Sequence, residues 1–343
     1  MSAIKVGLIG GGAVGAVHLE AYTINKDVQF VALADSDDSA RKQLASRFGI
    51  SKTFSDHKQL LEDESINLVD ICLPHHLHCQ VALDSFTAGK DVILEKPIAL
   101  SLEEADMMIK TAEKSKRRFF VALNQRFLPC HQSAKELLDN GEIGKPFLVL
   151  GTVIGDEFLR MNNAADWKGV RDKAGGGVLA DTGTHLIDIM HYFLGEPVSV
   201  AAFAKRLVVT PENKGDDNAL VALEFSNNVV ANLTLTFSAT SDNWSEKKDI
   251  YGTEGSLHIT NEAERPLFVI KNKSVPEYIE VKGGGDNWWG YSIKKGITHF
   301  IDCIINDKDP LVTPSDARKA LETILLCYQS TSEEGSMKRL TIR

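Results

Sequence analysis

The stretch from Ile4 to Leu19 reads IKVGLIGGGAVGAVHL. An apolar run ends at Ile9, a glycine cluster follows, and an amphipathic pattern begins near Ala13. Residues 10–15, GGGAVG, match G-x-G-x-x-G, a weak signal alone but typical of a dinucleotide-binding loop when it joins a strand to a helix. A weak signal peptide is the other interpretation, but the glycines and the single preceding lysine fit it poorly.

Each glycine of this loop has its own physical reason. Gly10 permits the tight turn, Gly12 lets backbone N–H groups approach a pyrophosphate, and Gly15 lets helix and strand pack closely. The helix N-terminus offers its positive dipole end to the phosphates. The residues that we expect to contact the dinucleotide are Gly10, Gly12, Ala13, Val14 and Gly15.

Asp35 ends the next apolar run, about 20 residues after Gly15. A carboxylate there hydrogen-bonds the ribose hydroxyls and repels a 2′-phosphate, so the sequence favours NAD over NADP. Ser36 beside it is assigned to the same contact. A tight strand–helix turn with no ligand is the alternative.

Residues 1–124 alternate short apolar runs with amphipathic stretches. This alternation is typical of a parallel sheet covered on both faces, and predicts a doubly wound Rossmann domain. The expected strands are Ile4–Ile9, Phe30–Ala34, Leu68–Leu73, Asp91–Leu94 and Phe119–Leu123, and the expected helices are Ala13–Tyr22, Ser39–Phe48, His75–Ala88 and Leu102–Lys114.

Residues 125–343 are predicted to form a second α/β domain with a large, mainly antiparallel open sheet. In Val230–Ser238 apolar residues alternate with Asn, Thr and Ser, which fits a strand with one packed and one polar face. Asn227-Asn228 predicts a hairpin turn before it. Further expected strands are Phe147–Ile154, Val198–Val208, Leu220–Phe225, Lys248–Tyr251, Ser256–Thr260, Leu267–Lys271 and Tyr278–Val281, followed by helices Trp289–Ile305 and Pro314–Gln329.

The composition of the 343 residues is that of a soluble globular protein, 43% apolar and 25% charged. The net charge of −9 argues against nucleic acid and anionic membranes as partners. No apolar run approaches the roughly 18 residues of a membrane helix. The five cysteines lack disulfide or zinc spacing and indicate a reduced, cytoplasmic protein.

Glu95-Lys96-Pro97 follows an apolar strand, and ligands bind at the carboxyl edge of such parallel sheets. The Lys96 ammonium would there polarise a carbonyl or stabilise an alkoxide during hydride transfer. A solvated Glu–Lys pair is the alternative, and a cis bond before Pro97 is compatible with the sequence.

Residues 73–78, LPHHLH, follow the preceding strand in the same way. Their three histidines have no tetrahedral spacing and no partner carboxylate, so we expect a helix start beside the nicotinamide and no metal. The residues assigned to the cofactor at these two strand ends are Leu73, Pro74, His75, His78, Glu95 and Lys96.

Three glycines, Gly175–Gly177, precede a helix that carries Asp181, His185 and Asp188 on one face. A histidine with a carboxylate one turn away suits proton transfer near neutral pH. The alternative makes Asp181 a helix N-cap and His185 a surface histidine. The opposite, buried stripe is Leu186, Ile189, Met190 and Phe193.

Together these motifs resemble the Gfo/Idh/MocA family, the glucose–fructose oxidoreductase and inositol dehydrogenase group, over essentially the whole chain. The motifs that carry the resemblance are Gly10–Gly15, Asp35, Pro74 with His78, Glu95-Lys96-Pro97, the NQRF of residues 124–127, Gly175–Gly177, Asp181 with His185, and the GTEG of residues 252–255.

The resemblance implies hydride transfer between a nicotinamide and a hydroxyl of a sugar, sugar derivative or cyclitol. It implies that His185 takes the hydroxyl proton, Lys96 lowers the pKa of that hydroxyl, and Asp181 orients the pair. It also implies homodimers or homotetramers that pair through the open sheet face.

Substrate contacts are the least determined part of the sequence. Arg126 of the NQRF motif is assigned to both cofactor and substrate, and aromatic faces suit a sugar ring, although each is also compatible with packing. The candidate substrate residues are Lys96, Arg126, Trp167, Arg171, Asp181, His185 and Trp288. The alternative functions are an NAD-dependent glycosidase-like enzyme that oxidises its sugar transiently, and a non-enzymatic dinucleotide sensor, which the presence of Lys96, Asp181 and His185 disfavours.

Overall fold

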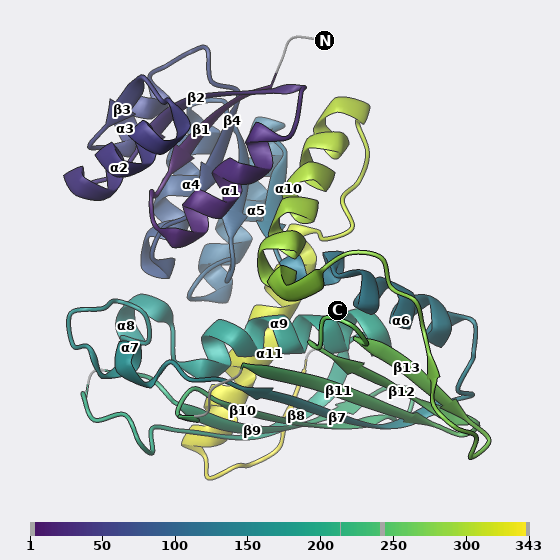
Figure 1. The fold of residues 1–343 in the computed structure, drawn as a ribbon. Coiled ribbons are helices and arrows are strands. Elements are labelled where there is room, and N and C mark those ends of the chain that lie inside the picture. The colour runs from purple at the N-terminus through teal and green to yellow at the C-terminus, as the bar shows by residue number, and fades with distance from the viewer. Residues whose placement is uncertain (1–3, 213, 241–243, 341–343) are drawn as a thin grey trace. The chain divides into compact units, whose positions relative to one another are not determined.

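The computed structural model describes residues 4–212, 214–240 and 244–340, and it divides into two compact units. Unit 1 is Met1–Asn124 with Ser292–Arg318, and unit 2 is Gln125–Tyr291 with Lys319–Arg343. Each unit is built on its own sheet (Figure 1). No helix within the described ranges is long and apolar enough to cross a membrane.

Unit 1 contains a six-stranded parallel sheet in the order β3-β2-β1-β4-β5-β6, which confirms the predicted doubly wound fold. The strand order reverses between β1 and β4, and ligands bind outside the carboxyl ends of strands at such a switch point. The strands are β1 (Ile4–Ile9), β2 (Val28–Ala34), β3 (Lys52–Phe54), β4 (Leu68–Ile71), β5 (Asp91–Glu95) and β6 (Phe119–Ala122).

The helices of unit 1 begin and end on local signals. Asp37 caps one helix by accepting from the N–H groups of Ser39 and Ala40, and Gly49 ends that helix in the left-handed region. The predicted helix from His75 is in fact a 3-10 turn, η1 (His75–Leu77), followed by an α-helix. The α-helices are α1 (Ala13–Thr23), α2 (Asp38–Phe48), α3 (His57–Leu61), α4 (His78–Thr87) and α5 (Leu102–Ser115).

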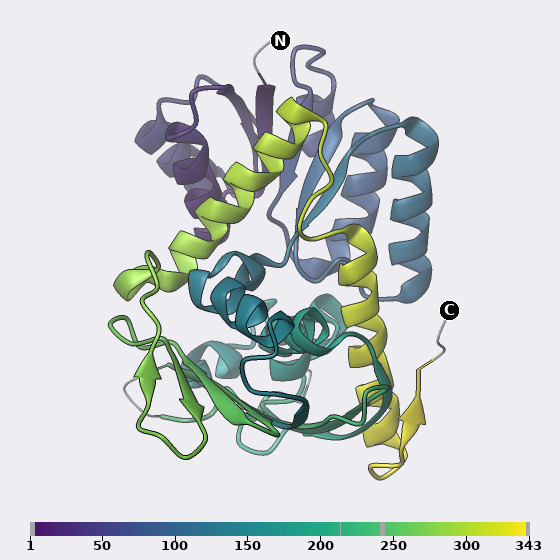
Figure 2. The same cartoon turned by 90° about the vertical axis from the view of Figure 1, so that its right-hand side faces the viewer.

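The segment Ser292–Arg318 packs with unit 1, although the sequence assigns it to the second domain. It holds most of α10 (Trp288–Asn306), the helix drawn in light green in Figure 2. The Phe300 ring stacks on Phe120 with centroids 5.0 Å apart, and Asn124 Nδ2 donates to Ser292 Oγ at 2.7 Å. Burial of the aromatic side chains stabilises the packing of this segment on unit 1, and local sequence periodicity does not reveal such a contact.

Unit 2 contains a nine-stranded sheet in the order β14-β13-β12-β11-β7-β10-β9-β8-β15. It is mainly antiparallel, as predicted, but mixed, because β10 runs parallel to β7. The predicted Asn227-Asn228 turn joins β9 to β10. The strands are β7 (Pro146–Ile154), β8 (Pro197–Lys205), β9 (Asn218–Phe225), β10 (Val230–Thr236), β11 (Ser245–Gly252), β12 (Gly255–Thr260), β13 (Leu267–Lys271), β14 (Glu277–Tyr278) and β15 (Lys338–Arg339).

Five helices accompany this sheet. α11 begins as predicted, with Pro314 as its first residue. Thr313 and Asp316 exchange hydrogen bonds across this start as a capping box. α6 and α7 lie in stretches where no helix was predicted. The helices are α6 (Pro129–Asp139), α7 (Phe158–Asn162), α8 (Arg171–Ala174), α9 (Val178–Leu194) and α11 (Pro314–Ser332).

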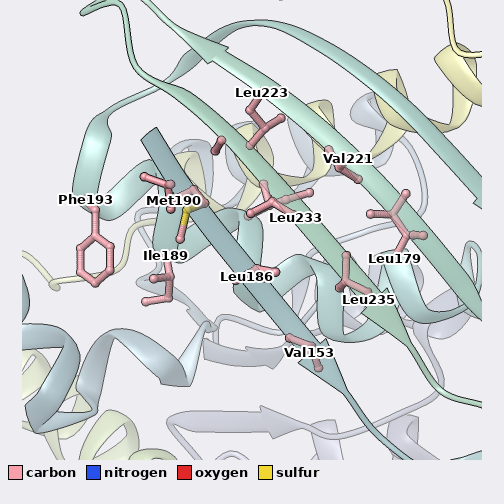
Figure 3. Close-up of a cluster of buried hydrophobic side chains, with 14 of the residues drawn as sticks. Val153, Leu179, Leu186, Ile189, Met190, Phe193, Val221, Leu223, Leu233 and Leu235 are labelled. Atoms are coloured by element: carbon pink, nitrogen blue, oxygen red, sulfur yellow. The ribbon is translucent and has the colours of Figure 1, made fainter. Parts of the chain in front are cut away.

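The core of unit 2 lies between α9 and the strands β7, β9 and β10 (Figure 3). Leu186 and Met190 on the helix point toward Leu233 and its neighbours, and each such buried side chain contributes about 1.5–3 kcal/mol. A Cβ at Gly151 would lie 2.7 Å from Leu233 Cδ2, so a larger residue there would require the Leu233 side chain to shift. This packing fixes which face of α9 turns toward the sheet.

Candidate active site

The glycine loop of unit 1 has the geometry that a pyrophosphate requires. Gly10 has a φ of +106°, and a Cβ there would lie 2.2 Å from the Cys72 carbonyl oxygen. A Cβ at Gly15 would lie 2.2 Å from the Gly10 oxygen, whereas a Cβ at Gly12 would meet nothing within 4 Å. The loop is therefore closed against the sheet and open at Gly12, so its backbone fits a dinucleotide.

The Asp35 carboxylate is held at the end of β2 by backbone donors. Its Oδ2 accepts from the Gly11 N–H at 2.6 Å, and its Oδ1 accepts from the Asp37 N–H at 2.7 Å. Arg41 turns away from the carboxylate, donating to the Asp35 carbonyl oxygen and pairing with Asp38. A fixed carboxylate at this place favours ribose hydroxyls over a 2′-phosphate.

A buried charge network lies beneath this loop. His18, fully buried on α1, contacts Asp70 Oδ2 at 2.8 Å and Glu95 Oε1 at 3.1 Å, and Tyr22 also donates to Asp70 at 2.7 Å. Burial alone would lower the pKa of His18, but Asp70 and Cys72 raise it well above its usual value. The raised pKa favours the protonated ring, which can donate from both nitrogens and so tie α1 to β4 and β5.

The network continues into the Glu95-Lys96-Pro97 turn. Glu95 Oε2 accepts from the Lys96 N–H at 3.1 Å, and the Lys96–Pro97 peptide is cis. His78 lies between the carbonyl oxygens of Leu73 and Pro97, at 2.9 and 2.8 Å, and burial lowers its pKa. Unit 1 therefore brings together the predicted residues at the ends of β4 and β5.

One group of potential metal ligands occurs among the described residues: His18, Asp70 and Cys72. These side chains already hydrogen-bond one another. Burial, reinforced by Asp70, raises the pKa of Cys72 to about 12, and a protonated thiol and a cationic imidazole are poor ligands. The group is best described as a hydrogen-bonded charge network.

In unit 2 the start of α9 is fixed by Asp216, a residue that the sequence did not single out. Asp216 Oδ1 accepts from the Gly177 N–H and Oδ2 from the Leu179 N–H, both at 2.9 Å, while Tyr328 donates to Oδ1 at 2.7 Å. The alternative role of Asp181 as helix cap is therefore wrong, because Asp216 satisfies these N–H groups. Asp181 lies in the first turn of α9.

The Asp181 side chain, mostly buried, pairs with Lys168, whose Nζ lies 2.7 Å from Asp181 Oδ2. His185 follows one turn later and is half-buried. The sequence did not predict Lys168, which lies in a loop without periodicity. The only available signal was its place beside Trp167, ahead of the glycine triplet.

The third residue of the predicted face, Asp188, is committed elsewhere. The Arg126 guanidinium binds it through Nε at 3.0 Å and Nη2 at 2.6 Å, and both side chains are buried. The same guanidinium stacks over Tyr192 at 5.2 Å. The structure thus places Arg126 in an internal ion pair of unit 2, and its assignment to cofactor and substrate stays a prediction.

The other substrate candidates of unit 2 lie in two places. Trp167 directly precedes Lys168 and is half-buried, and Arg171 begins α8 and is exposed. Trp288 lines a pocket together with the buried Glu246–Lys248 ion pair and the loop Gly283–Gly285.

A doubly wound sheet with this glycine loop and a fixed carboxylate after β2 defines a dinucleotide-dependent oxidoreductase. The chain belongs to the Gfo/Idh/MocA family. The family model described as an oxidoreductase NAD-binding Rossmann fold matches residues 4–123, and the model of its C-terminal alpha/beta domain matches residues 135–338. The predicted family, fold and NAD cofactor are confirmed.

Similar proteins include named dehydrogenases. Levoglucosan dehydrogenase of Pseudarthrobacter phenanthrenivorans is 30% identical over 78% of this chain and 76% of its own length. Myo-inositol 2-dehydrogenase of Thermotoga maritima is 24% identical over 98% of both chains. A solved levoglucosan dehydrogenase in complex with NADH and levoglucosan superposes with a TM-score of 0.88 at 26% identity, covering 98% of this chain and 99% of that one.

Proposed function

We propose that the protein is an NAD-dependent dehydrogenase that oxidises a secondary hydroxyl of a sugar, sugar derivative or cyclitol. The observation that carries the proposal is the mostly buried Asp181 carboxylate on α9, one turn before His185 and paired with Lys168. The relatives are named as dehydrogenases of levoglucosan and of inositols, and these names support the substrate class.

Three residues are assigned to the reaction. His185 accepts the hydroxyl proton, because an imidazole titrates near neutral pH. The Lys96 ammonium lowers the pKa of that hydroxyl by stabilising its alkoxide form, and Asp181 orients hydroxyl and imidazole. NAD, when bound, supplies the nicotinamide that accepts the hydride.

The cofactor contacts follow from unit 1. The N–H groups of the glycine loop would hold the pyrophosphate, and Asp35 would bind the ribose hydroxyls. The remaining assigned contacts, carried over from the sequence, are Ala13, Val14, Ser36, Leu73, Pro74, His75, His78, Glu95 and Arg126.

The glycosidase-like alternative uses the same residues but ends with elimination and regenerated NAD. The relatives reported above are named dehydrogenases, which supports net oxidation instead. Net NADH formation distinguishes the two, since a glycosidase-like enzyme releases a leaving group without it.

The test is a panel of polyols, aldoses, anhydrosugars and inositols with NAD, followed by nicotinamide absorbance. We expect activity with a ring-bearing substrate that Lys96→Ala and His185→Ala each lower by about 100-fold or more. Lys110→Ala, an exposed lysine on α5, is the matched control and keeps wild-type activity. Full activity in both site variants would refute the assignment.

We also propose that the open sheet face pairs two subunits. Leu150, Phe203, Leu220 and Val230 are exposed on strands β7 to β10, and Phe203 lies opposite Leu220 in the ladder. Such a patch is typical of a protein interface. Leu220→Lys should lower the mass measured by light scattering to that of a monomer, whereas Leu207→Lys, at a more exposed leucine after β8, should leave the mass unchanged. A wild-type protein that is monomeric contradicts the proposal.

A further inference from the structure

Lys168 is held close to the proposed catalytic carboxylate. Its Nζ lies 2.7 Å from Asp181 Oδ2, with 22% and 10% of the two side chains exposed. None of the motifs named in the sequence includes this lysine. Burying two charges costs desolvation free energy, which is offset only when the geometry of the pair is good and its remaining hydrogen-bonding groups are satisfied.

The loop that carries Lys168 is anchored from several sides. Asp166 Oδ1 accepts from the Lys168 N–H at 2.9 Å, and Arg160 Nε binds Asp166 Oδ2 at 2.9 Å. The buried Lys214 donates to the carbonyl oxygens of Asp166 and Lys168, at 2.6 and 3.2 Å. The ammonium of Lys168 therefore starts from a fixed backbone.

The turn of α9 that carries Asp181 is anchored by the same segment that holds this loop, since Lys214 and Asp216 are two residues apart. The Gly215 N–H between them donates to the Gly169 carbonyl oxygen at 2.5 Å. The turn of α9 is tied to Asp216, and Asp216 is in turn bound by Tyr328. One segment, Lys214–Asp216, thus fixes both the backbone that presents the cation and the backbone that presents the carboxylate. This is the arrangement of a preorganised pair rather than a chance surface contact.

The charges around Lys168 keep it an ammonium ion. Burial alone would lower the pKa of Lys168 and Arg160 opposes its charge, but Asp181 and Glu157 raise that pKa above its usual value. Asp166 is engaged with Arg160, and Lys214 is directed at backbone carbonyls. Asp181 therefore has a permanent cation beside it at neutral pH.

We propose that Lys168 is a positioning residue of the dehydrogenase site, which fixes the Asp181 carboxylate in its ionised form and through it orients the reacting hydroxyl. This inference rests on the function proposed above for Asp181. An aspartate held in an ion pair does not compete for the substrate proton, which leaves proton acceptance to His185.

The experiment compares Lys168→Met, Lys168→Arg and Lys173→Met, the last replacing an exposed lysine a few residues along the same segment. Lys168→Met should lower kcat by about 100-fold with KM for NAD unchanged, because misplacement of the orienting group acts on the chemical step. Lys168→Arg should restore most of the activity, and Lys173→Met should equal wild type.

The pH profile separates positioning from mere support of the fold. In wild type the acid limb of kcat/KM reports one protonation, that of His185. In Lys168→Met the Asp181 carboxylate also titrates, so the acid limb should steepen from a slope of about one to about two. Carboxyl-carbon NMR of Asp181, assigned through Asp181→Asn, should show its midpoint rising by about one to three pH units.

The outcomes separate two failures. Full activity in Asp181→Asn would refute the proposed function. An inactive Asp181→Asn together with a Lys168→Met variant that matches Lys173→Met in kcat and pH profile would overturn the role of Lys168 alone, as would an unmoved Asp181 midpoint. If Lys168→Met does not fold, Lys168→Gln supplies the same readouts.

Discussion

The candidate residues of the two units are held in place by different physical means. In unit 1 the backbone itself shapes the glycine loop, because there is no room for a Cβ at Gly10 or Gly15 and Gly12 faces open space. In unit 2 charged side chains hold the candidate residues, since Lys168 holds Asp181 and Arg126 holds Asp188. Backbone constraints leave a readable signature in sequence, whereas pairs between distant side chains do not.

The largest expected effect breaks a charged pair of unit 2. Arg126→Leu leaves Asp188 buried without its cation and should lower the free energy of unfolding by about 3–5 kcal/mol. The double variant Arg126→Leu with Asp188→Leu removes both charges and should recover most of that loss. Urea denaturation measures both. Equal losses in the single and double variants would show that packing of Arg126, including its stacking on Tyr192, outweighs its charge.

A smaller effect is expected from two glycines of the same loop in unit 1. Gly15→Ala forces a Cβ against the Gly10 carbonyl and should cost about 1–3 kcal/mol of stability and abolish NADH binding. Gly12→Ala has space for its Cβ and a φ of −73°, so stability should stay within about 0.5 kcal/mol while NADH fluorescence binding is lost. Wild-type NADH affinity in Gly12→Ala would contradict the role of this backbone in binding pyrophosphate.

Asp35 combines both means, because its carboxylate is the proposed ribose contact and backbone N–H groups hold that carboxylate in place. Asp35→Asn should lower the ratio of kcat/KM with NAD to that with NADP by about tenfold, a change of about 1.4 kcal/mol. Asp27→Asn, an exposed control on the same domain, should leave the ratio unchanged. A wild-type enzyme that prefers NADP would reverse the assignment.

Much of unit 1 was predictable because its signals are local. The apolar runs at Ile4–Ile9 and Phe119–Leu123 recur as β1 and β6. The short elements β3 and α3 escaped because three to five residues carry too little periodicity to recognise. Glu95, Lys96 and His78 were grouped correctly since parallel strands end at one edge.

The parts that could not be predicted depend on contacts between distant residues. Nothing local marks Ser292–Arg318 as part of unit 1, because the Phe300–Phe120 contact joins segments far apart in sequence. Lys168 likewise has no repeat or cap to distinguish it, and Asp216 caps α9 from beyond β8. Asp181, His185 and Asp188 do lie at helical spacing on α9, but the Asp188 carboxylate is bound by Arg126.

The smallest expected effect is a pH trend in the charged network of unit 1, where buried side chains pair as they do in unit 2. His18 has a raised pKa in the folded state, so it binds its proton more tightly there than in the unfolded chain. Its stabilising contribution is fully present below its ordinary value of about 6.5 and is lost as the pH rises through the folded value. His18→Gln should therefore lower the free energy of unfolding most at acidic pH, with a difference from wild type that shrinks as pH increases. Tyr22→Phe removes a neutral donor to the same Asp70 and should give a constant offset below about pH 9, where Cys72 also stays protonated. A constant offset for His18→Gln as well would contradict a raised pKa of His18 in the folded state.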